Sequence, residues 1–202
     1  MKLGNRYKIC KRLGASIFEK CQTQSFQLSA ARSAKNKKKG RRNVSEFNRQ
    51  LIEKQKLRLM YGLTEGQFSR YIETALENHV NPQETLFQGL ETRLDSIIYR
   101  MGLAGTRRMA RQIASHGHIT VNGTRVTIPS YRMRVGDAIA VREGSRSSSL
   151  FANANEKLAE YNAPAWVSFN ATTFDGSLTS LPSLAGQDTG VDMQAVFEFY
   201  TR

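Results

Sequence analysis

The chain has 202 residues, of which 40% are hydrophobic, enough for one or two domains with their own cores. Thirty Lys and Arg stand against 17 Asp and Glu, giving a formal net charge of +13. No apolar run is long enough to span a membrane. This balance favours nucleic acid or an anionic surface as the partner over an acidic small molecule.

Charge is segregated along the sequence. Residues 1–58 hold 17 basic and 3 acidic side chains, and residues 93–146 hold 10 and 3. Residues 59–92 and 147–202 are both net acidic. The alternation predicts defined surfaces, some for phosphate and others for protein or solvent.

Residues 1–44 are predicted to form a basic arm that is extended or only partly helical. The arm has too few apolar residues to fold alone, so we expect it to become ordered on a polyanion. Its two cysteines, Cys10 and Cys21, are too far apart for a zinc knuckle, and the histidines lie elsewhere. We therefore expect no metal site, no cofactor and a reducing compartment.

Residues 45–92 have helical periodicity. A helix is predicted from Ser45 to Met60, and the sequence of residues 64–67 is a capping box for the next helix. That helix has one apolar face and ends before Pro82, which fits the first turn of a third helix. Residues 91–101 are expected to continue helically.

The helix expected after Thr106 carries Arg107, Arg108 and Arg111 within one narrow arc, opposite an apolar stripe. Thr106 fits the N-cap, and Gly117 fits the position after the helix. Cations at a helix N-terminus are disfavoured by the macrodipole. The three arginines also repel one another. We expect a bound polyanion to relieve both effects; the alternative is a solvated basic face.

Beyond this helix the hydrophobic period changes to two. Asn122-Gly123 predicts a type I′ hairpin, and Gly136-Asp137 predicts a second turn. Residues 143–154 have the composition of a linker, with a short helix expected near 155–161. Residues 166–169 and 196–200 are expected to be strand-like or docking segments, and 171–190 mostly loop.

Two stretches resemble a known family. RLDSIIYRMGLAGTRRMARQIASHGHITVNGTRV (93–126) resembles the small RNA-binding module of two helices and a hairpin found in several RNA-binding proteins. EKQKLRLMYGLTEGQFSRYIETA (53–75) resembles the signature helix pair of bacterial-type small ribosomal subunit protein four. Many members of this family carry four closely grouped cysteines near the N-terminus that bind zinc. This chain lacks them, so it resembles the family's zinc-free variant.

The resemblance implies an α+β fold in three parts. These are the arm (1–44), a helical lobe (45–92, completed by 147–202) and an inserted RNA-binding module (93–146) with two helices and a small antiparallel sheet. It implies a structural protein, not an enzyme, that binds 16S rRNA and nucleates assembly of its 5′ domain. It also implies contact with small-subunit protein five near the mRNA entry, a contribution to translational accuracy, and mRNA as a further partner. The expected location is the small ribosomal subunit, in the cytoplasm or an organelle, without membrane association.

The expected RNA contacts are the basic side chains of these segments, with polar side chains at the turns of the module. They are Lys37, Lys38, Lys39, Arg41, Arg42, Lys54, Lys56, Arg58, Arg70, Arg93, Arg107, Arg108, Arg111, His116, Asn122, Arg125, Arg132 and Arg134.

Two alternatives use the same module. Arg93-Leu94-Asp95 matches the short catalytic signature of pseudouridine synthases, but too little chain remains for their catalytic domain. A free-standing RNA chaperone would lack the helical pair of residues 45–92.

Overall fold

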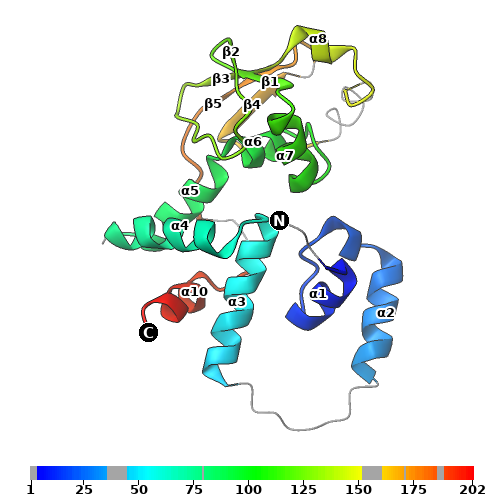
Figure 1. Cartoon of the computed structure of the whole chain (residues 1–202), viewed down its shortest axis with the longest axis vertical. Coiled ribbons are helices and arrows are strands. Elements are labelled where there is room, and N and C mark those ends of the chain that lie inside the picture. Colours follow the sequence, from blue (N-terminus) through cyan, green and yellow to red (C-terminus); the bar gives the residue numbers. More distant parts are fainter. Residues whose placement is uncertain (1–3, 36–44, 79, 152–160, 171, 186–188) are drawn as a thin grey trace. The chain divides into compact units, whose positions relative to one another are not determined.

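The computed structural model describes residues 4–35, 45–78, 80–151, 161–170, 172–185 and 189–202 (Figure 1). The chain divides into two compact units. The first unit contains residues 1–76 and 187–202, and the second contains residues 77–186. The first is helical in its described part, and the second combines helices with an antiparallel sheet, so the predicted α+β class is confirmed.

The N-terminal segment of the first unit is folded. Helix α1 (Arg6–Leu13), the 3-10 turn η1 (Glu19–Cys21) and helix α2 (Gln24–Lys35) surround a small core. The segment expected to be an extended or only partly helical arm is therefore folded over residues 6–35, but not alone, because α3 contributes to its core. Leu59 of the following helix completes this core, which contains Cys10, Leu13, Phe18, Cys21, Phe26 and Leu59.

Three further helices complete the first unit: α3 (Glu46–Met60), α4 (Glu65–Glu77) and α10 (Met193–Tyr200). The predicted caps are present. The Ser45 Oγ accepts from the Asn48 N–H, and the backbone N–H groups and side chains of Thr64 and Gln67 cap each other reciprocally. The segment 196–200, expected to be strand-like or a docking segment, docks on α3 as a helix, and Asp192 caps this helix by accepting from the Ala195 N–H at 3.2 Å.

Helix α10 packs on α3 through a buried lysine. Lys54 is 6% exposed, and its Nζ lies 2.6 Å from Glu65 Oε1 and 4.3 Å from the centre of the Phe199 ring. The Tyr200 hydroxyl donates to the same Glu65 oxygen at 2.8 Å. Burial opposes ionisation of Glu65, but hydrogen bonds from Lys54 and Tyr200 outweigh it and hold the pKa of this carboxyl below its usual value. We call Lys54, Glu65, Phe199 and Tyr200 the C-terminal latch.

The second unit packs two of its three longer helices, α6 (Leu94–Arg100) and α7 (Arg107–Ser115), against one sheet (Figure 1). The third is α5 (Pro82–Glu91), and a single helical turn, α8 (Glu143–Arg146), follows the third strand. The strands are β1 (Ile119–Val121), β2 (Thr124–Arg125), β3 (Ala138–Val141), β4 (Val167–Asn170) and β5 (Asp175–Leu178). Their order is β2-β1-β3-β5-β4, with every neighbouring pair antiparallel.

Strands β4 and β5 change the expected division of the chain. β5 pairs with β3, so this part of 147–202 extends the sheet of the second unit instead of completing the helical lobe. Trp166 is accordingly buried in the core beneath the sheet, and Phe151, from the expected linker, is 2% exposed in the same core. The sequence of β5 has little apolar alternation, and its Gly176 leaves room for the Ser168 carbonyl of β4, with which an added Cβ would clash. The helix expected near 155–161 falls almost wholly outside the described residues.

The two thiols of the first unit are expected to react slowly in the folded protein. Cys10 and Cys21 are 1% and 0% exposed, and burial together with the neighbouring Cys10 thiol raises the pKa of Cys21 to about 12. Ellman's reagent should label neither thiol promptly in native buffer and both promptly in guanidinium chloride. Immediate labelling of the native protein would contradict this burial.

Candidate nucleic-acid interface

Helix α7 has the boundaries that the sequence predicts. The Thr106 Oγ1 accepts from the Met109 N–H at 3.0 Å, and Gly117 adopts a left-handed φ of 72° directly after the helix. Ala110 and Ile113 are buried on its inner face. The helix therefore holds its arginines at fixed positions beside α6.

Asp95 of α6 binds two arginines. Arg93 donates from Nε and Nη2 to the two carboxylate oxygens at 2.9 and 2.8 Å. Arg111 of α7 donates from Nε and Nη2 to Oδ2 at 2.9 and 2.8 Å. The side chains of Asp95 and Arg93 are only 4% and 5% exposed, so this pairing is buried.

Glu91, at the end of α5, binds two further arginines. Its side chain has no exposed surface. Arg100 forms a two-point pair with it at 2.9 and 2.7 Å, and Arg107 donates to Oε1 at 3.0 Å. Arg107 also donates to the Ser96 Oγ at 3.2 Å, and its guanidinium lies 4.7 Å from the centre of the Tyr99 ring. We call these pairs, centred on Glu91 and Asp95, the buried carboxylate pairs.

The buried carboxylate pairs overturn one expectation from the sequence. The repulsion among the arginines of α7 was expected to need an external polyanion, but Glu91 and Asp95 supply anions from within the fold. The sequence could not predict this, because periodicity within α7 does not reveal carboxylates presented by α5 and α6. Of the three arginines in the predicted arc, Arg108 is the exposed one, and no ion pair holds it among the described residues.

Arg93 occupies a different place from the one predicted. Helix α5 ends at Glu91, and the backbone at Arg93 is extended and pairs with Arg132, which interrupts the helix expected over 91–101. The Arg93 guanidinium turns inward to Asp95. Its burial places this predicted RNA contact inside the unit.

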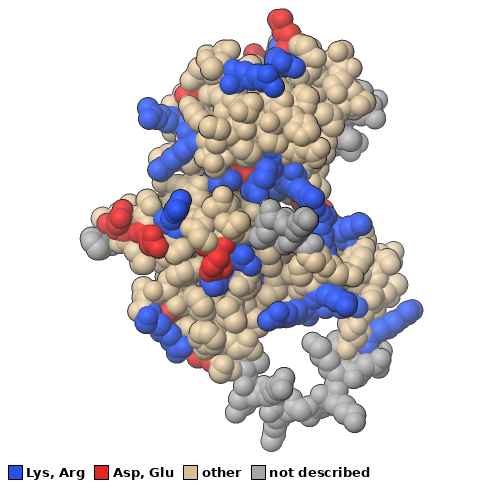
Figure 2. Space-filling view, viewed as in Figure 1, with Lys and Arg blue, Asp and Glu red and all other residues tan. Residues whose placement is uncertain are grey.

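The exposed cations of the second unit lie on several of its segments. Arg125 donates from Nη2 to the His116 carbonyl at 3.0 Å and lies over Gly117, where an added Cβ would clash with the guanidinium. Arg132 and Arg134 are exposed on either side of Met133, which is buried. Figure 2 shows more Lys and Arg than Asp and Glu on the face that it presents.

His118 reports the positive potential near the hairpin. Burial is the largest cause that lowers its pKa, and the charges of His116, Arg142 and Arg125 lower it further. Its Nδ1 lies 3.0 Å from the Ser145 Oγ. The cationic surroundings of His118 therefore favour an anion over another cation.

Asn122 has a structural role in the hairpin. Its φ of 48° and the φ of 79° at Gly123 confirm the predicted turn. The carboxamide donates to Asp137 Oδ1 at 2.8 Å and accepts from the Ala138 N–H at 2.9 Å. These two bonds tie the hairpin to β3, so the predicted RNA contact of this side chain has a competing partner within the fold.

In the first unit, most of the predicted contacts that lie in the described residues have acidic neighbours. Lys54 belongs to the C-terminal latch, Lys56 pairs with Glu53 at 2.6 Å, and Arg58 lies 3.4 Å from Glu65. Arg70 is exposed. The remaining predicted contacts of this unit, Lys37, Lys38, Lys39, Arg41 and Arg42, lie outside the described residues.

Two further exposed basic residues were not among the predicted contacts. Arg142 is the N-cap of the single turn α8 and Arg146 is its last residue, next to and within the segment expected to be a linker. The signal that could have found them is a pair of arginines four residues apart, directly after the apolar run of β3.

Two kinds of feature are not found in the described ranges. Within them, no three His, Cys, Asp or Glu side chains gather as metal ligands. Nor does any described helix combine the length and apolar character needed to cross a bilayer.

Two family models match the chain. The S4 domain matches residues 92–139, and the ribosomal protein S4/S9 N-terminal domain matches residues 2–91, including the segment 16–44, which lies outside both of the motifs quoted above. The chain is similar to proteins described as small ribosomal subunit protein uS4. It is 40% identical to that of Acetivibrio thermocellus, 41% to that of Roseiflexus castenholzii and 41% to that of Limosilactobacillus fermentum. These alignments cover 98%, 96% and 98% of both chains.

Neutralising Glu91 is expected to destabilise the second unit. Glu91→Gln leaves Arg100 and Arg107 beside an uncharged amide in a buried site, which should cost about 3 kcal/mol of unfolding free energy. The exposed Glu143→Gln in the same unit is the matched control and should change stability by less than about 0.5 kcal/mol. Equal urea midpoints for the two variants would contradict the buried carboxylate pairs.

Neighbouring arginines of α7 are expected to separate stability from RNA affinity. Arg108→Gln should keep the thermal midpoint and reduce the slope of log affinity against log salt for folded rRNA by about 0.7–0.9. Arg107→Gln should instead lower the midpoint, because Glu91 loses a partner. Titrations at several salt concentrations and calorimetry of both variants test this; an unchanged slope for Arg108→Gln removes it from the interface.

Proposed function

Because the chain belongs to the uS4 family of small ribosomal subunit proteins, we propose that it is a structural constituent of the small subunit whose second unit binds rRNA. The observation that carries this proposal is that the arginines of the second unit fall into two groups. Four are held inside the fold by the buried carboxylate pairs, and a separate set is exposed to solvent. The exposed set comprises Arg108, Arg125, Arg132, Arg134, Arg142 and Arg146.

An exposed set of this kind suits folded RNA. Double-helical RNA is recognised mainly through its phosphates and shape, and cations held at fixed spacing match converging phosphate backbones. Each guanidinium offers several donors in a fixed plane, which suits phosphate oxygens. A rigid base beneath the cations also limits the entropy lost on binding.

We further propose that the RNA is the 5′ domain of 16S rRNA, which the protein helps to nucleate. The likeness to uS4 proteins over nearly the whole chain supports this assignment. By the same likeness, we propose that the first unit lies near small-subunit protein five and the mRNA entry and contributes to decoding accuracy. The location would then be the small subunit of a cytoplasmic or organellar ribosome.

The two alternative functions have less support. A pseudouridine synthase needs an accessible aspartate, whereas Asp95 is 3% exposed and binds two arginines. A free-standing chaperone would use the module alone, whereas the S4/S9 N-terminal model matches the chain over residues 2–91. We therefore propose a role without catalysis.

Footprinting on 16S rRNA tests the proposal. The purified protein should protect nucleotides of the 5′ domain, and changing Arg108, Arg132 and Arg134 together to Gln should remove part of that protection while circular dichroism is retained. The wild type should also sediment with small subunits at one copy each. Protection confined to the 3′ domains, or sub-stoichiometric attachment to free large subunits, would overturn the proposal.

A further inference from the structure

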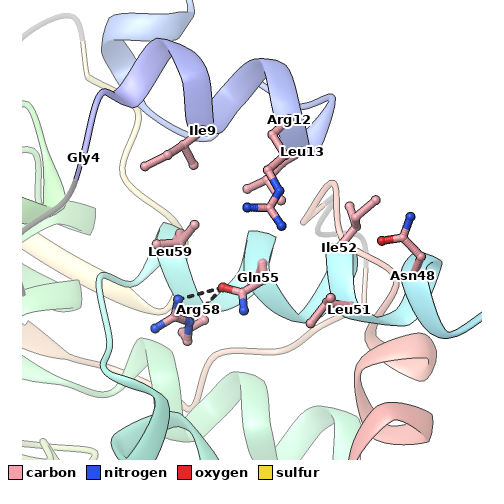
Figure 3. Close-up of a pocket in the computed structure, with 10 residues that line it drawn as sticks. All are labelled: Gly4, Ile9, Arg12, Leu13, Asn48, Leu51, Ile52, Gln55, Arg58 and Leu59. Atoms are coloured by element: carbon pink, nitrogen blue, oxygen red, sulfur yellow. Dashed lines mark hydrogen bonds between the residues drawn. The ribbon is translucent and has the colours of Figure 1, made fainter.

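A groove of about 510 Å³ lies between α1 and α3, within the first unit (Figure 3). Ile9 and Leu13 reach toward it from α1, and Ile52 and Leu59 form its apolar wall on α3. This volume lies within the range of small-ligand pockets. The residues that line the groove belong neither to the exposed arginines of the second unit nor to the C-terminal latch.

The polar residues that line the groove are cationic or neutral. Arg12, Asn48, Gln55 and Arg58 line it, and none of the described lining residues is acidic. Arg12 is exposed and extends from α1 toward α3, and no ion pair neutralises it among the residues described (Figure 3). The groove therefore combines apolar walls, carboxamides and a cation available at its rim.

Gln55 is oriented for hydrogen bonding. Its Oε1 accepts from Arg58 Nε at 3.1 Å and from Arg58 Nη2 at 2.7 Å, which fixes the plane of the carboxamide (Figure 3). The Nε2 group is left as a donor. Asn48, which lies on the same face of α3, adds both a donor and an acceptor.

We propose that this groove binds one unpaired nucleotide of RNA. The base would pack on Ile9, Ile52 and Leu59, its polar edge would meet Asn48 and Gln55, and its phosphate would pair with Arg12. An unpaired base has apolar faces and a hydrogen-bonding edge, which match the two kinds of wall. The inference rests on the proposed function, because it needs rRNA as the partner.

Two other occupants fit less well. An apolar protein side chain would cover the aliphatic wall but give no partner to the Arg12 guanidinium, the Asn48 carboxamide or the Gln55 Nε2, which costs free energy on desolvation. An RNA duplex would meet Arg12 at the rim, but its paired bases could not reach Ile52 between the helices. An extruded nucleotide satisfies both the polar and the apolar residues.

The test measures binding of the full chain to a 5′-domain transcript of 16S rRNA, together with chemical modification of the bound RNA. Ile52→Trp fills the groove, and Leu28→Trp, at a 55% exposed site on α2, is the matched control. Ile52→Trp should weaken binding on the order of tenfold, while Leu28→Trp stays within about twofold of wild type. One unpaired base should be protected by the wild type and become reactive in the Ile52→Trp complex.

A second pair of variants avoids the packing change at Ile52. Arg12→Gln and Arg32→Gln remove the same charge from exposed positions on α1 and α2. Arg12→Gln should weaken binding several-fold more than Arg32→Gln and expose the same base as Ile52→Trp. Equal effects of the two variants would mean that only the general charge matters, and would overturn the groove site.

The outcomes separate this inference from the proposed function. If the wild type does not bind the transcript, the proposed function fails. If it binds and both Ile52→Trp and Arg12→Gln match their controls, the proposed function stands and the groove site is wrong. If Ile52→Trp binds RNA normally but fails to enter small subunits, a protein occupies the groove and the nucleotide proposal is overturned.

Discussion

The second unit depends on two carboxylates placed among four guanidinium groups. A buried anion without a partner is very unfavourable, so Glu91 and Asp95 are stable in the interior only while Arg93 and the arginines of α6 and α7 are held against them. The reverse also holds, because Arg107 lies at the N-terminus of α7, where the macrodipole disfavours a cation. Anions and cations from different helices therefore fix one another, and the cluster retains an excess of positive charge.

Local rules predicted the elements whose signals are local. The caps at Ser45, Thr64 and Thr106 follow from hydrogen bonds within a few residues, and so does the Asn122-Gly123 turn. The ion pairs of α7 could not be predicted in this way, because Asp95 and Arg111 meet only after two helices pack. Strand β5 was missed for a related reason: its place depends on the close approach of β4 at Gly176 and not on an apolar alternation.

The N-terminal segment shows where composition misleads. Counting its own apolar residues predicts that it cannot bury a core, and that count leaves out Leu59, which α3 contributes. Stacking of Tyr7 on Phe26, with ring centres 5.4 Å apart, adds an aromatic contact across α1 and α2. The same packing places Ile9 and Arg12 opposite α3, so the groove exists only because the segment folds.

Of the candidate interface, the sequence predicted the exposed Arg108, Arg125, Arg132 and Arg134, but not which basic residues turn inward.

The C-terminal latch has a consequence for the order in which the protein takes shape during its own synthesis. The second unit is one continuous stretch, 77–186, and has all its strands once that stretch has left the ribosome. The first unit is discontinuous and receives α10 only after the second has been made. Until then Lys54 lacks the aromatic rings that cover it, and the face of α3 that receives α10 stays open to water. The packing of α10 on α3 is therefore a late event, because it brings together two segments that are separated in the sequence by the whole of the second unit.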